Sequence, residues 1–214
     1  MLSARRTMHT ELTYGEAVAN TEKVLIKGRF TKADVFITRV GGRRFVVKDY
    51  SKKGFWERNI VGRIVIGREA RAYDALVGID GLPSRFKRIS PFTFAMEYLE
   101  GKDLGAVERG EIGPEVIRQF ERIVRDLHER GWVHLDLHRR SNILLVNGSV
   151  YVVDLASALH PGSIPLIGSC LTSLIGIADL LSLIKMKTIY GPELMSPREQ
   201  AWLRIRNRVM PSKW

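Results

Sequence analysis

Apolar and polar positions along the first hundred residues form the short runs that are typical of β-strands. Runs rich in β-branched and aromatic side chains predict five strands, at residues 23–28, 34–40, 43–48, 85–89 and 92–98. Gly41-Gly42 predicts a hairpin turn between the second and third of them. Glu69, Tyr73 and Leu76 lie four and three residues apart, as on one face of a helix. We therefore expect a sheet with a helix inserted between its third and fourth strands.

The second half of the chain has the longer apolar period of helices. Pro114 suits the first position of a helix. An apolar stripe follows, at Val116, Phe120, Ile123, Val124 and Leu127. Two short strands are predicted at residues 142–146 and 150–153, with Asn147-Gly148 as the turn of their hairpin. The remaining residues are expected to be helical.

This change of pattern near residue 100 predicts one α+β domain of two lobes. Residues 1–100 would form a β-rich N-lobe and residues 101–214 a reduced helical C-lobe. A length of 214 residues fits a single domain of this kind. We expect a cleft between the lobes, because ligands commonly bind in such clefts.

One apolar stretch in the C-lobe is long enough to cross a membrane. Residues 164–184 carry a single charge, Asp179. Pro165, Gly168 and Gly176 interrupt the stretch, and an acidic group in mid-membrane is costly. The sequence therefore favours a buried helix of a soluble domain over a membrane span.

The charge of the chain indicates anionic partners. Lys and Arg number 34 and Asp and Glu 23, which gives a net charge of +11 and points to phosphates, nucleic acid or an acidic membrane surface. The one cysteine, Cys170, excludes an intrachain disulfide and a cysteine-rich zinc site. The first residues lack the apolar core of a signal peptide. We expect a cytoplasmic protein, with peripheral association at the cytoplasmic face of the inner membrane left open.

The polar segment between the long helix and the hairpin concentrates residue types used in catalysis. It contains His134, Asp136 and Asn142. Asp154 follows eighteen residues after Asp136, at the end of an apolar strand. Carboxylates and an amide in such positions can orient a hydroxyl group and hold metal ions on phosphates. An isolated His-x-Asp is a weak signal, so the interpretation depends on further matches.

Three further matches occur in the N-lobe, in the order that a known superfamily has them. Lys48 ends the third predicted strand, Glu69 lies in the helix after it, and residues 96–101 (Met-Glu-Tyr-Leu-Glu-Gly) end the fifth strand. Together with the C-lobe segment, this order resembles the protein-kinase-like superfamily. The resemblance covers roughly residues 24–160 and implies a two-lobed kinase fold that uses ATP and Mg²⁺.

The resemblance implies roles for the polar residues of the C-lobe. Asp136 would be the catalytic base, and His134 would orient the backbone of the catalytic loop. Asn142 and Asp154 would hold Mg²⁺. Arg140, within the same loop, would neutralise charge on the transferring phosphoryl group or bind an anionic substrate. A solvated basic turn is the alternative for Arg140.

In the N-lobe the resemblance implies a nucleotide site. Lys48, paired with Glu69, would bind the α- and β-phosphates. Gly28 would be the first glycine of the loop that covers the phosphates. Glu97 and Leu99 would lie in the hinge whose backbone holds the adenine. A lysine at a strand end and an acid on a helix are otherwise ordinary surface charges.

Three departures from the superfamily pattern concern these same segments. Phe30 and Ala33 occupy the second and third glycine positions of the phosphate loop. Asn142 lies six residues after Asp136 instead of five, so the catalytic loop needs a one-residue bulge. Residues 154–156 read Asp-Leu-Ala in place of Asp-Phe-Gly. Each charged catalytic group is kept, so an active enzyme is favoured over a pseudokinase.

The short C-lobe resembles that of minimal kinases. Only 60 residues follow Asp154, and RIO kinases and bacterial lipopolysaccharide-core (Kdo or heptose) kinases are comparably small. The acceptor would be a lipopolysaccharide-core sugar, another anionic small molecule, or a protein serine or threonine. Asp179 resembles the buried acid that braces the catalytic-loop backbone in this superfamily.

Two other functions are open on the sequence alone. The first is a non-catalytic pseudokinase or a basic module that binds nucleic acid or a membrane, since residues 185–214 hold seven basic and two acidic side chains. The second is a metal-dependent hydrolase. His134, Asp136 and His138 alternate, so in an extended segment all three would face one side and, with Asp154, could bind a metal ion.

Overall fold

The structure is a computed structural model that describes residues 12–209, without the side chains of Arg109 and residues 205–209. The chain divides into two compact units. The first contains the residues up to Gly78, Leu82–Glu100 and Val153–Ala158, and the second contains Ile79–Gly81, Gly101–Val152 and the residues from Leu159 onward. The segment Val153–Ala158 lies in the first unit, although the sequence pattern assigns it to the C-lobe.

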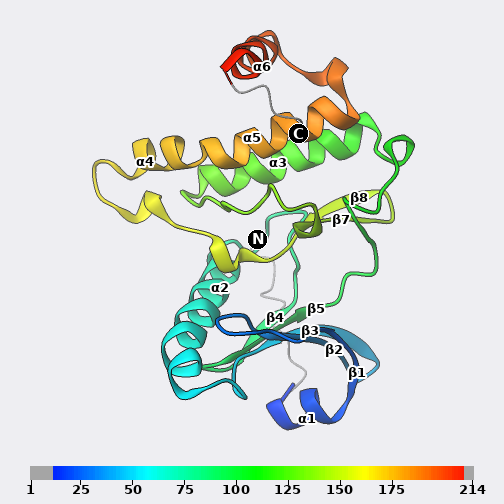
Figure 1. Ribbon diagram of the computed structural model, residues 1–214, viewed down its shortest axis with the longest axis vertical. Helices are drawn as coiled ribbons and strands as arrows, with labels where there is room; N and C mark the ends of the chain where they lie inside the picture. Colours follow the sequence, from blue (N-terminus) through cyan, green and yellow to red (C-terminus); the bar gives the residue numbers. More distant parts are fainter. Residues whose placement is uncertain (1–11, 210–214) are drawn as a thin grey trace, which may run out of the picture. The chain divides into compact units, whose positions relative to one another are not determined.

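The first unit is a five-stranded antiparallel sheet with two helices (Figure 1). Its elements are α1 (Tyr14–Ala19), β1 (Thr21–Ile26), β2 (Asp34–Val40), β3 (Arg43–Asp49), a π-helical segment (Glu57–Gly62), α2 (Arg63–Ala75), β4 (Phe86–Ser90), β5 (Thr93–Glu97) and a 3-10 turn (Leu155–Ser157). The strand order is β1-β2-β3-β5-β4. All five strands overlap the predicted runs, and β1 begins and ends two residues earlier than predicted. The α+β class is confirmed.

Helix α1 is an element that the strand pattern does not predict. Thr13 and Glu16 form a capping box, in which the hydroxyl of Thr13 accepts from the Glu16 backbone N–H and the Glu16 carboxylate accepts from the Thr13 backbone N–H. The helix packs on one face of the sheet in an apolar cluster formed by Leu12, Ala17, Phe36, Phe45, Val47 and Ala95. The cap makes a helix of only six residues stable at this position.

The two faces of β3 serve different purposes because successive side chains of a strand point to opposite faces. Phe45 and Val47 belong to the cluster under α1. Lys48 therefore points to the other face, where Phe94 is its partner across the strand pair. Phe94 stacks on Tyr73 of α2 with 5.4 Å between ring centroids. The alternation thus directs Lys48 toward α2.

The second unit has three long helices and a small sheet (Figure 1). Its elements are β6 (Lys102–Asp103), α3 (Pro114–Glu129), β7 (Ile143–Val146), β8 (Ser149–Val152), α4 (Gly168–Ile175), α5 (Ile177–Tyr190), α6 (Pro197–Val209) and 3-10 turns at Arg109–Glu111, Arg140–Asn142, Pro161–Ser163 and Pro192–Leu194. Helix α3 begins at the predicted proline and lies beside α5. Asn147 and Gly148 have φ of 48° and 79°, as the predicted two-residue hairpin requires. Strand β6, which pairs with β7, is an addition to the predicted elements.

The apolar stretch over residues 164–184 forms α4 and α5. The continuous stretch Gly168–Tyr190 is long and apolar enough to cross a membrane by length and composition, a test that core helices of soluble proteins also pass. Within it, Asp179 is fully buried, and Lys187 is buried in contact with Glu121 and Glu199. Buried charges with partners are what a core helix needs. Only 39% of the apolar window is buried, however, so the choice between a core helix and a membrane-associated one stays a prediction.

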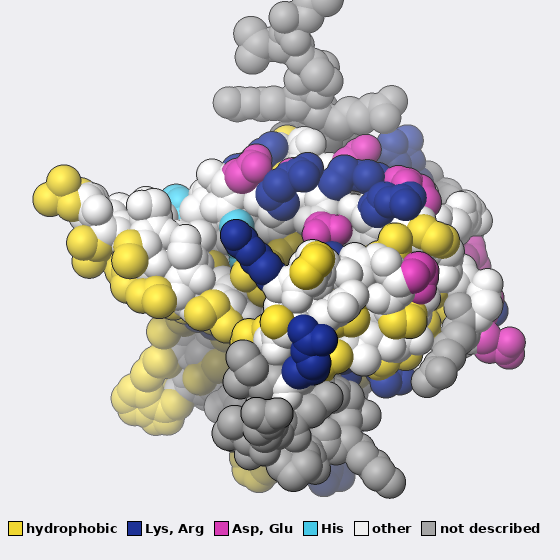
Figure 2. All heavy atoms as spheres, turned by 90° about the horizontal axis from the view of Figure 1, so that it is seen from above, with side chains coloured by type: hydrophobic (Ala, Val, Ile, Leu, Met, Phe, Trp, Pro, Cys, Tyr) yellow, Lys and Arg dark blue, Asp and Glu magenta, His cyan; other side chains and the backbone are white. Residues whose placement is uncertain are grey.

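Exposed apolar side chains lie just before α4 and near its end. Leu166, Ile167 and Leu174 are exposed, and Figure 2 shows hydrophobic side chains gathered along this projecting segment. At the other end of the unit, the basic stretch of residues 185–214 includes α6. The side chains from Ile205 onward lie outside the described residues, so the binding-module hypothesis for this stretch stays a prediction.

Candidate active site

Lys48 forms the centre of a buried ionic cluster in the first unit. Its Nζ donates hydrogen bonds to Glu69 Oε1 and to Asp154 Oδ1, each over 2.7 Å. The Glu69 side chain is fully buried in α2 and that of Lys48 is 12% exposed. The three residues come from β3, α2 and the segment after β8, up to 106 residues apart in sequence. The fold brings together the lysine, glutamate and aspartate that the motif order indicates.

The charges in this cluster hold one another ionised. Burial by itself lowers the pKa of Lys48, but the negative charges of Glu69 and Asp154 outweigh it and raise that pKa above its ordinary value. Burial raises the pKa of Glu69, and the charge of Lys48 opposes this rise. The Glu69 atom Oε2 is buried without a hydrogen-bond partner in the described part of the chain. The glutamate therefore depends on Lys48 for its charge.

Asp154 has a strained backbone that places its side chain. Its φ and ψ are 67° and 69°, in the left-handed region that few non-glycine residues occupy. Such strain is common at functional sites because the surrounding structure must enforce it. The 3-10 turn that follows, Leu155–Ser157, packs against α2. The carboxylate is 37% exposed, so a cation from solvent can reach it.

We expect Lys48→Met to make the folded state sensitive to pH. The variant leaves Glu69 buried without its cation, which should lower the free energy of unfolding by about 3–5 kcal/mol near neutral pH. The folded-state pKa of Glu69 then lies further above its ordinary value of 4.5, so the unfolded state loses its proton first as pH rises. Stability should therefore fall as pH rises above about 4.5.

Urea unfolding at several pH values measures this effect. The double variant Lys48→Met/Glu69→Gln is the matched control, because it removes the buried charge together with its partner. It should regain most of the lost stability and lack the pH dependence of the single variant. Identical pH dependence in the single and double variants would show that Glu69 does not need Lys48.

The catalytic-loop segment of the second unit is held by a buried acid from α5. Asp179 Oδ2 accepts from the backbone N–H of His134 at 2.7 Å, and Asp179 Oδ1 accepts from that of Leu135 at 2.8 Å. Its Oδ2 also lies 3.1 Å from His128 Nε2. Leu135 has a φ of 69°, so these bonds stabilise a strained turn. Asp179 thus occupies the bracing position that its resemblance to the superfamily implies.

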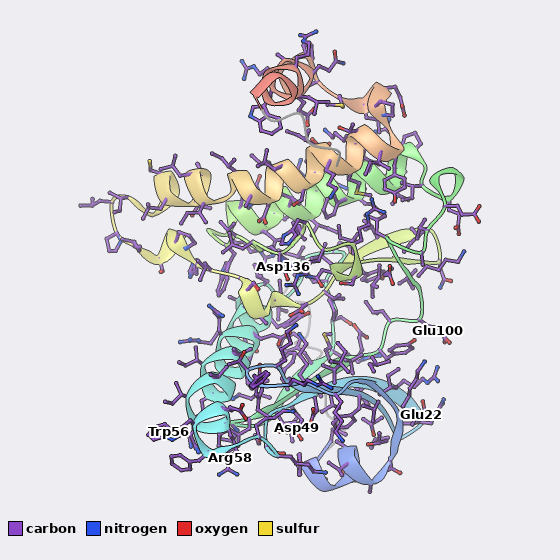
Figure 3. The ribbon with its side chains drawn as sticks, in the orientation of Figure 1. Glu22, Asp49, Trp56, Arg58, Glu100 and Asp136 are labelled. Atoms are coloured by element: carbon purple, nitrogen blue, oxygen red, sulfur yellow. The ribbon has the colours of Figure 1, made fainter. Side chains whose placement is uncertain are left out.

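Asp136 lies in the loop between α3 and β7 (Figure 3), where neighbouring side chains fix its carboxylate. Its Oδ1 is 3.1 Å from Arg139 Nε and 3.4 Å from His138 Nδ1. Asn142 Nδ2 donates to Asp136 Oδ2 at 3.2 Å and to the Asp136 carbonyl at 3.0 Å. The 3-10 turn Arg140–Asn142 carries the longer loop into β7, and it brings Asn142 beside Asp136.

The arginine that contacts Asp136 is not the one for which the sequence predicts a role. Arg140 is exposed, and its backbone carbonyl accepts a hydrogen bond from the Leu104 N–H at 3.2 Å. Arg139 is the arginine that contacts Asp136. The motif comparison assigned the role to Arg140, because spacing alone cannot tell which of two adjacent side chains turns inward. The proposed role of Arg140 stays a prediction.

The hinge and the phosphate loop have defined positions in the first unit. Glu97 ends β5, and its side chain accepts from the backbone N–H groups of Ser84 and Arg85. The backbone N–H of Glu97 also donates to the Arg85 carbonyl at 2.8 Å, so the adenine contact of this residue stays a prediction. Leu99 follows it and is half-buried. Gly28 lies in the loop between β1 and β2.

The hydrolase hypothesis requires a metal site that the fold does not form. Residues 12–209 contain no group of three or more His, Cys, Asp or Glu side chains placed to hold a metal ion. His134 is fully buried, and its Nδ1 accepts from the Asp136 N–H at 3.3 Å. The predicted alternation of His134, Asp136 and His138 fails because the strained turn at Leu135 breaks the extended conformation. The site of His134, Asp136 and His138 was therefore a wrong alternative.

The remaining donors suit a different metal chemistry. The Asp154 carboxylate supplies hard oxygen donors, which Mg²⁺ prefers when phosphate oxygens complete its coordination. Asp154 is accessible and adjoins Lys48, a cation that can bind the same phosphates. Asp154 beside Lys48 fits a nucleotide-bound Mg²⁺, and the metal role of Asn142 stays a prediction.

The fold defines the class of protein: the chain has a protein-kinase-like fold. It is 28% identical over 138 residues to a Bacillus subtilis (strain 168) protein described as "Putative serine/threonine-protein kinase YrzF", covering 64% of this chain and 60% of that protein. Among solved structures, it resembles the Rio2 kinase of Chaetomium thermophilum in a complex with ADP/Mg²⁺ and phosphoaspartate, with a TM-score of 0.57 and 15% identity.

The extent of these matches limits what they show. The Rio2 match covers 87% of this chain and 64% of that one, and at 15% identity it concerns the fold alone. The chain thus spans less than two thirds of the length of both proteins. No family model matches the sequence. The comparisons therefore show a kinase-like fold.

Proposed function

We propose that the protein is a kinase that transfers the γ-phosphoryl group of ATP to a hydroxyl group. The observation that carries this proposal is the buried cluster in which Lys48 bridges Glu69 and Asp154 at 2.7 Å. A lysine held by a helix glutamate beside an accessible aspartate is the arrangement that binds nucleotide phosphates and their metal ion in kinases. A pseudokinase or a general binding module has no need to keep all three charges.

In the proposed reaction each polar residue has a defined task. Lys48 binds the phosphates, Asp154 and Asn142 hold Mg²⁺, and the Glu97–Leu99 backbone binds the adenine. Bound Mg²⁺ would neutralise charge on the phosphates. Asp136 orients the acceptor hydroxyl and accepts its proton while the acceptor oxygen bonds to the γ-phosphorus.

The same step breaks the bond between the γ-phosphorus and the oxygen of the β-phosphate, so ADP leaves with that oxygen. His134 and Asp179 act on the loop backbone and keep Asp136 in position. Arg139 and Arg140 add positive charge beside the reacting group. The chain's own residues therefore supply positioning, charge and a proton acceptor, which are the requirements of phosphoryl transfer.

The class of acceptor is proposed from the net charge of the chain. A net charge of +11 favours an anionic acceptor, such as a lipopolysaccharide-core sugar, over a neutral one. A protein serine or threonine is the alternative, in line with the description of the Bacillus relative. Use of ATP fits the expected cytoplasmic location, and membrane or nucleic-acid association stays a prediction.

A panel assay with ATP labelled at the γ-phosphate tests this proposal. Purified protein is incubated with Mg²⁺ and separately with lipopolysaccharide-core sugars, mixed proteins and RNA. We expect label in one acceptor class and an equal amount of ADP. Binding of ATP without labelled product in any class, together with salt-sensitive binding of RNA or anionic lipid, would favour the binding-module hypothesis instead.

A further inference from the structure

The loop between β1 and β2 is fastened at its first residue by two side chains. The carboxylate of Asp34 accepts from the Gly28 N–H at 2.9 Å, and Lys53 Nζ donates to the Gly28 carbonyl at 2.8 Å. Lys53 and Asp34 also pair with each other at 2.7 Å. Both backbone polar groups of Gly28 are thereby engaged. The Lys53 side chain is only 12% exposed, so this pair is shielded from solvent.

The middle of the loop is held independently. Tyr50 is buried, and its hydroxyl donates to the Thr31 carbonyl at 3.0 Å. The Lys32 N–H donates to the Arg29 carbonyl at 3.2 Å and closes a turn. Phe30, inside that turn, has a φ of 52°, in the region that glycine prefers. Phe30 thus has a glycine-like backbone conformation at a position where the superfamily pattern has glycine.

Gly28 itself has no room for a side chain. A Cβ at this position would lie 2.2 Å from the carbonyl oxygens of Lys32 and Ala33. The two ends of the loop therefore approach each other closely, and the Asp34–Lys53 pair lies at that approach. The loop has one tight shape that side chains from outside it maintain.

We propose that Lys53 and Asp34 are positioning residues that hold the β1–β2 loop in the shape that binds the phosphates of ATP. This inference rests on the proposed kinase function. A glycine-rich loop reaches phosphates because glycines let its backbone adopt the required turn. Here two of the three glycine positions are occupied by other residues. The contacts of Lys53 and Asp34 with Gly28 hold the loop in the required turn instead. An ordered loop loses less entropy on binding, which favours affinity.

Lys53→Met tests the proposal, with the neighbouring Lys52→Met as the matched control. Lys52 is exposed, and its variant removes the same charge one residue away. Hydrogen exchange of the amides at residues 28–33 should be about tenfold faster in Lys53→Met, the scale for losing one charged hydrogen bond. The KM for ATP should rise about tenfold with kcat changed less than about threefold. Affinity for adenosine, which has no phosphates, should stay unchanged.

Three further results test the positioning role. Lys53→Arg retains a donor that can reach Gly28 and Asp34, so it should restore most of the ATP affinity. Equal exchange rates and KM values in Lys53→Met and Lys52→Met would overturn the positioning role. An equal loss of ATP and adenosine affinity would overturn it as well, since it would indicate general damage to the unit.

Failure of the wild-type protein to bind ATP would contradict the kinase proposal. The hydrogen-exchange experiment would still test whether Lys53 holds the loop in place, because it needs no nucleotide. Faster exchange confined to Lys53→Met would support the fastening, and unchanged exchange would overturn it.

Discussion

Asp136→Asn is expected to lower the rate of phosphoryl transfer by about two to four orders of magnitude, the range for removing a positioned general base. The substitution keeps the size of the side chain and much of its hydrogen bonding to Asn142. It removes the negative charge and the ability to accept the proton of the acceptor hydroxyl. Affinity for ATP should be unchanged, because the proposed metal and phosphate contacts belong to other residues.

Asp126→Asn is the control for this variant. Asp126 lies in α3 and makes a side-chain contact with Arg125 at 3.6 Å, so its variant changes the same charge in the same unit. Single-turnover transfer and equilibrium ATP binding should both match wild type in the control. Wild-type transfer by Asp136→Asn would remove this residue from the mechanism and would favour a binding module.

Asp154→Asn is expected to lower transfer by about three orders of magnitude, because the metal-assisted stabilisation of phosphate charge amounts to several kcal/mol. Asparagine is chosen because it tolerates the left-handed backbone at φ 67°, whereas alanine does not. The neutral amide weakens metal binding and removes one of the two carboxylates on Lys48. In contrast to Asp136→Asn, the Mg²⁺-dependent part of ATP affinity should also be lost.

The control for Asp154→Asn is Asp74→Asn, on the exposed side of α2 in the same unit. Titration of Mg²⁺ at fixed ATP gives the measurement, with thermal unfolding to confirm that each variant folds. Unchanged magnesium dependence of transfer in Asp154→Asn would show that the metal is held elsewhere. Asp154→Ala should also abolish turnover, and comparison with Asp154→Asn separates the charge from the backbone strain.

Local signals explain why most elements could be predicted from the sequence. The strand Asp34–Val40 and the helix start at Pro114 agree with the predicted limits, because each is determined by neighbouring residues. Helix α1 had a readable signal in Thr13 and Glu16, a capping box at the standard spacing. Strand β6, with two residues, has no pattern of its own and exists because β7 pairs with it.

The candidate site was predictable where an order of motifs could be compared with a known superfamily. Lys48 and Glu69 lie 21 residues apart and have no local pattern that joins them, yet the structure places them in contact. The contact of Lys53 with Gly28 could not be predicted in this way. A lysine in a polar loop resembles a solvated charge, and only the folded sheet shows that its carbon chain is buried.

The most direct test of the kinase mechanism is a single-turnover reaction with ATP labelled at the γ-phosphate, Mg²⁺ and the acceptor identified by the panel. The account predicts that ADP and labelled acceptor form at the same rate and in equal amounts, and that Asp136→Asn slows both at least a hundredfold. ATP that stays bound and intact would contradict it, as would label released only as free phosphate at a rate that Asp136→Asn leaves unchanged.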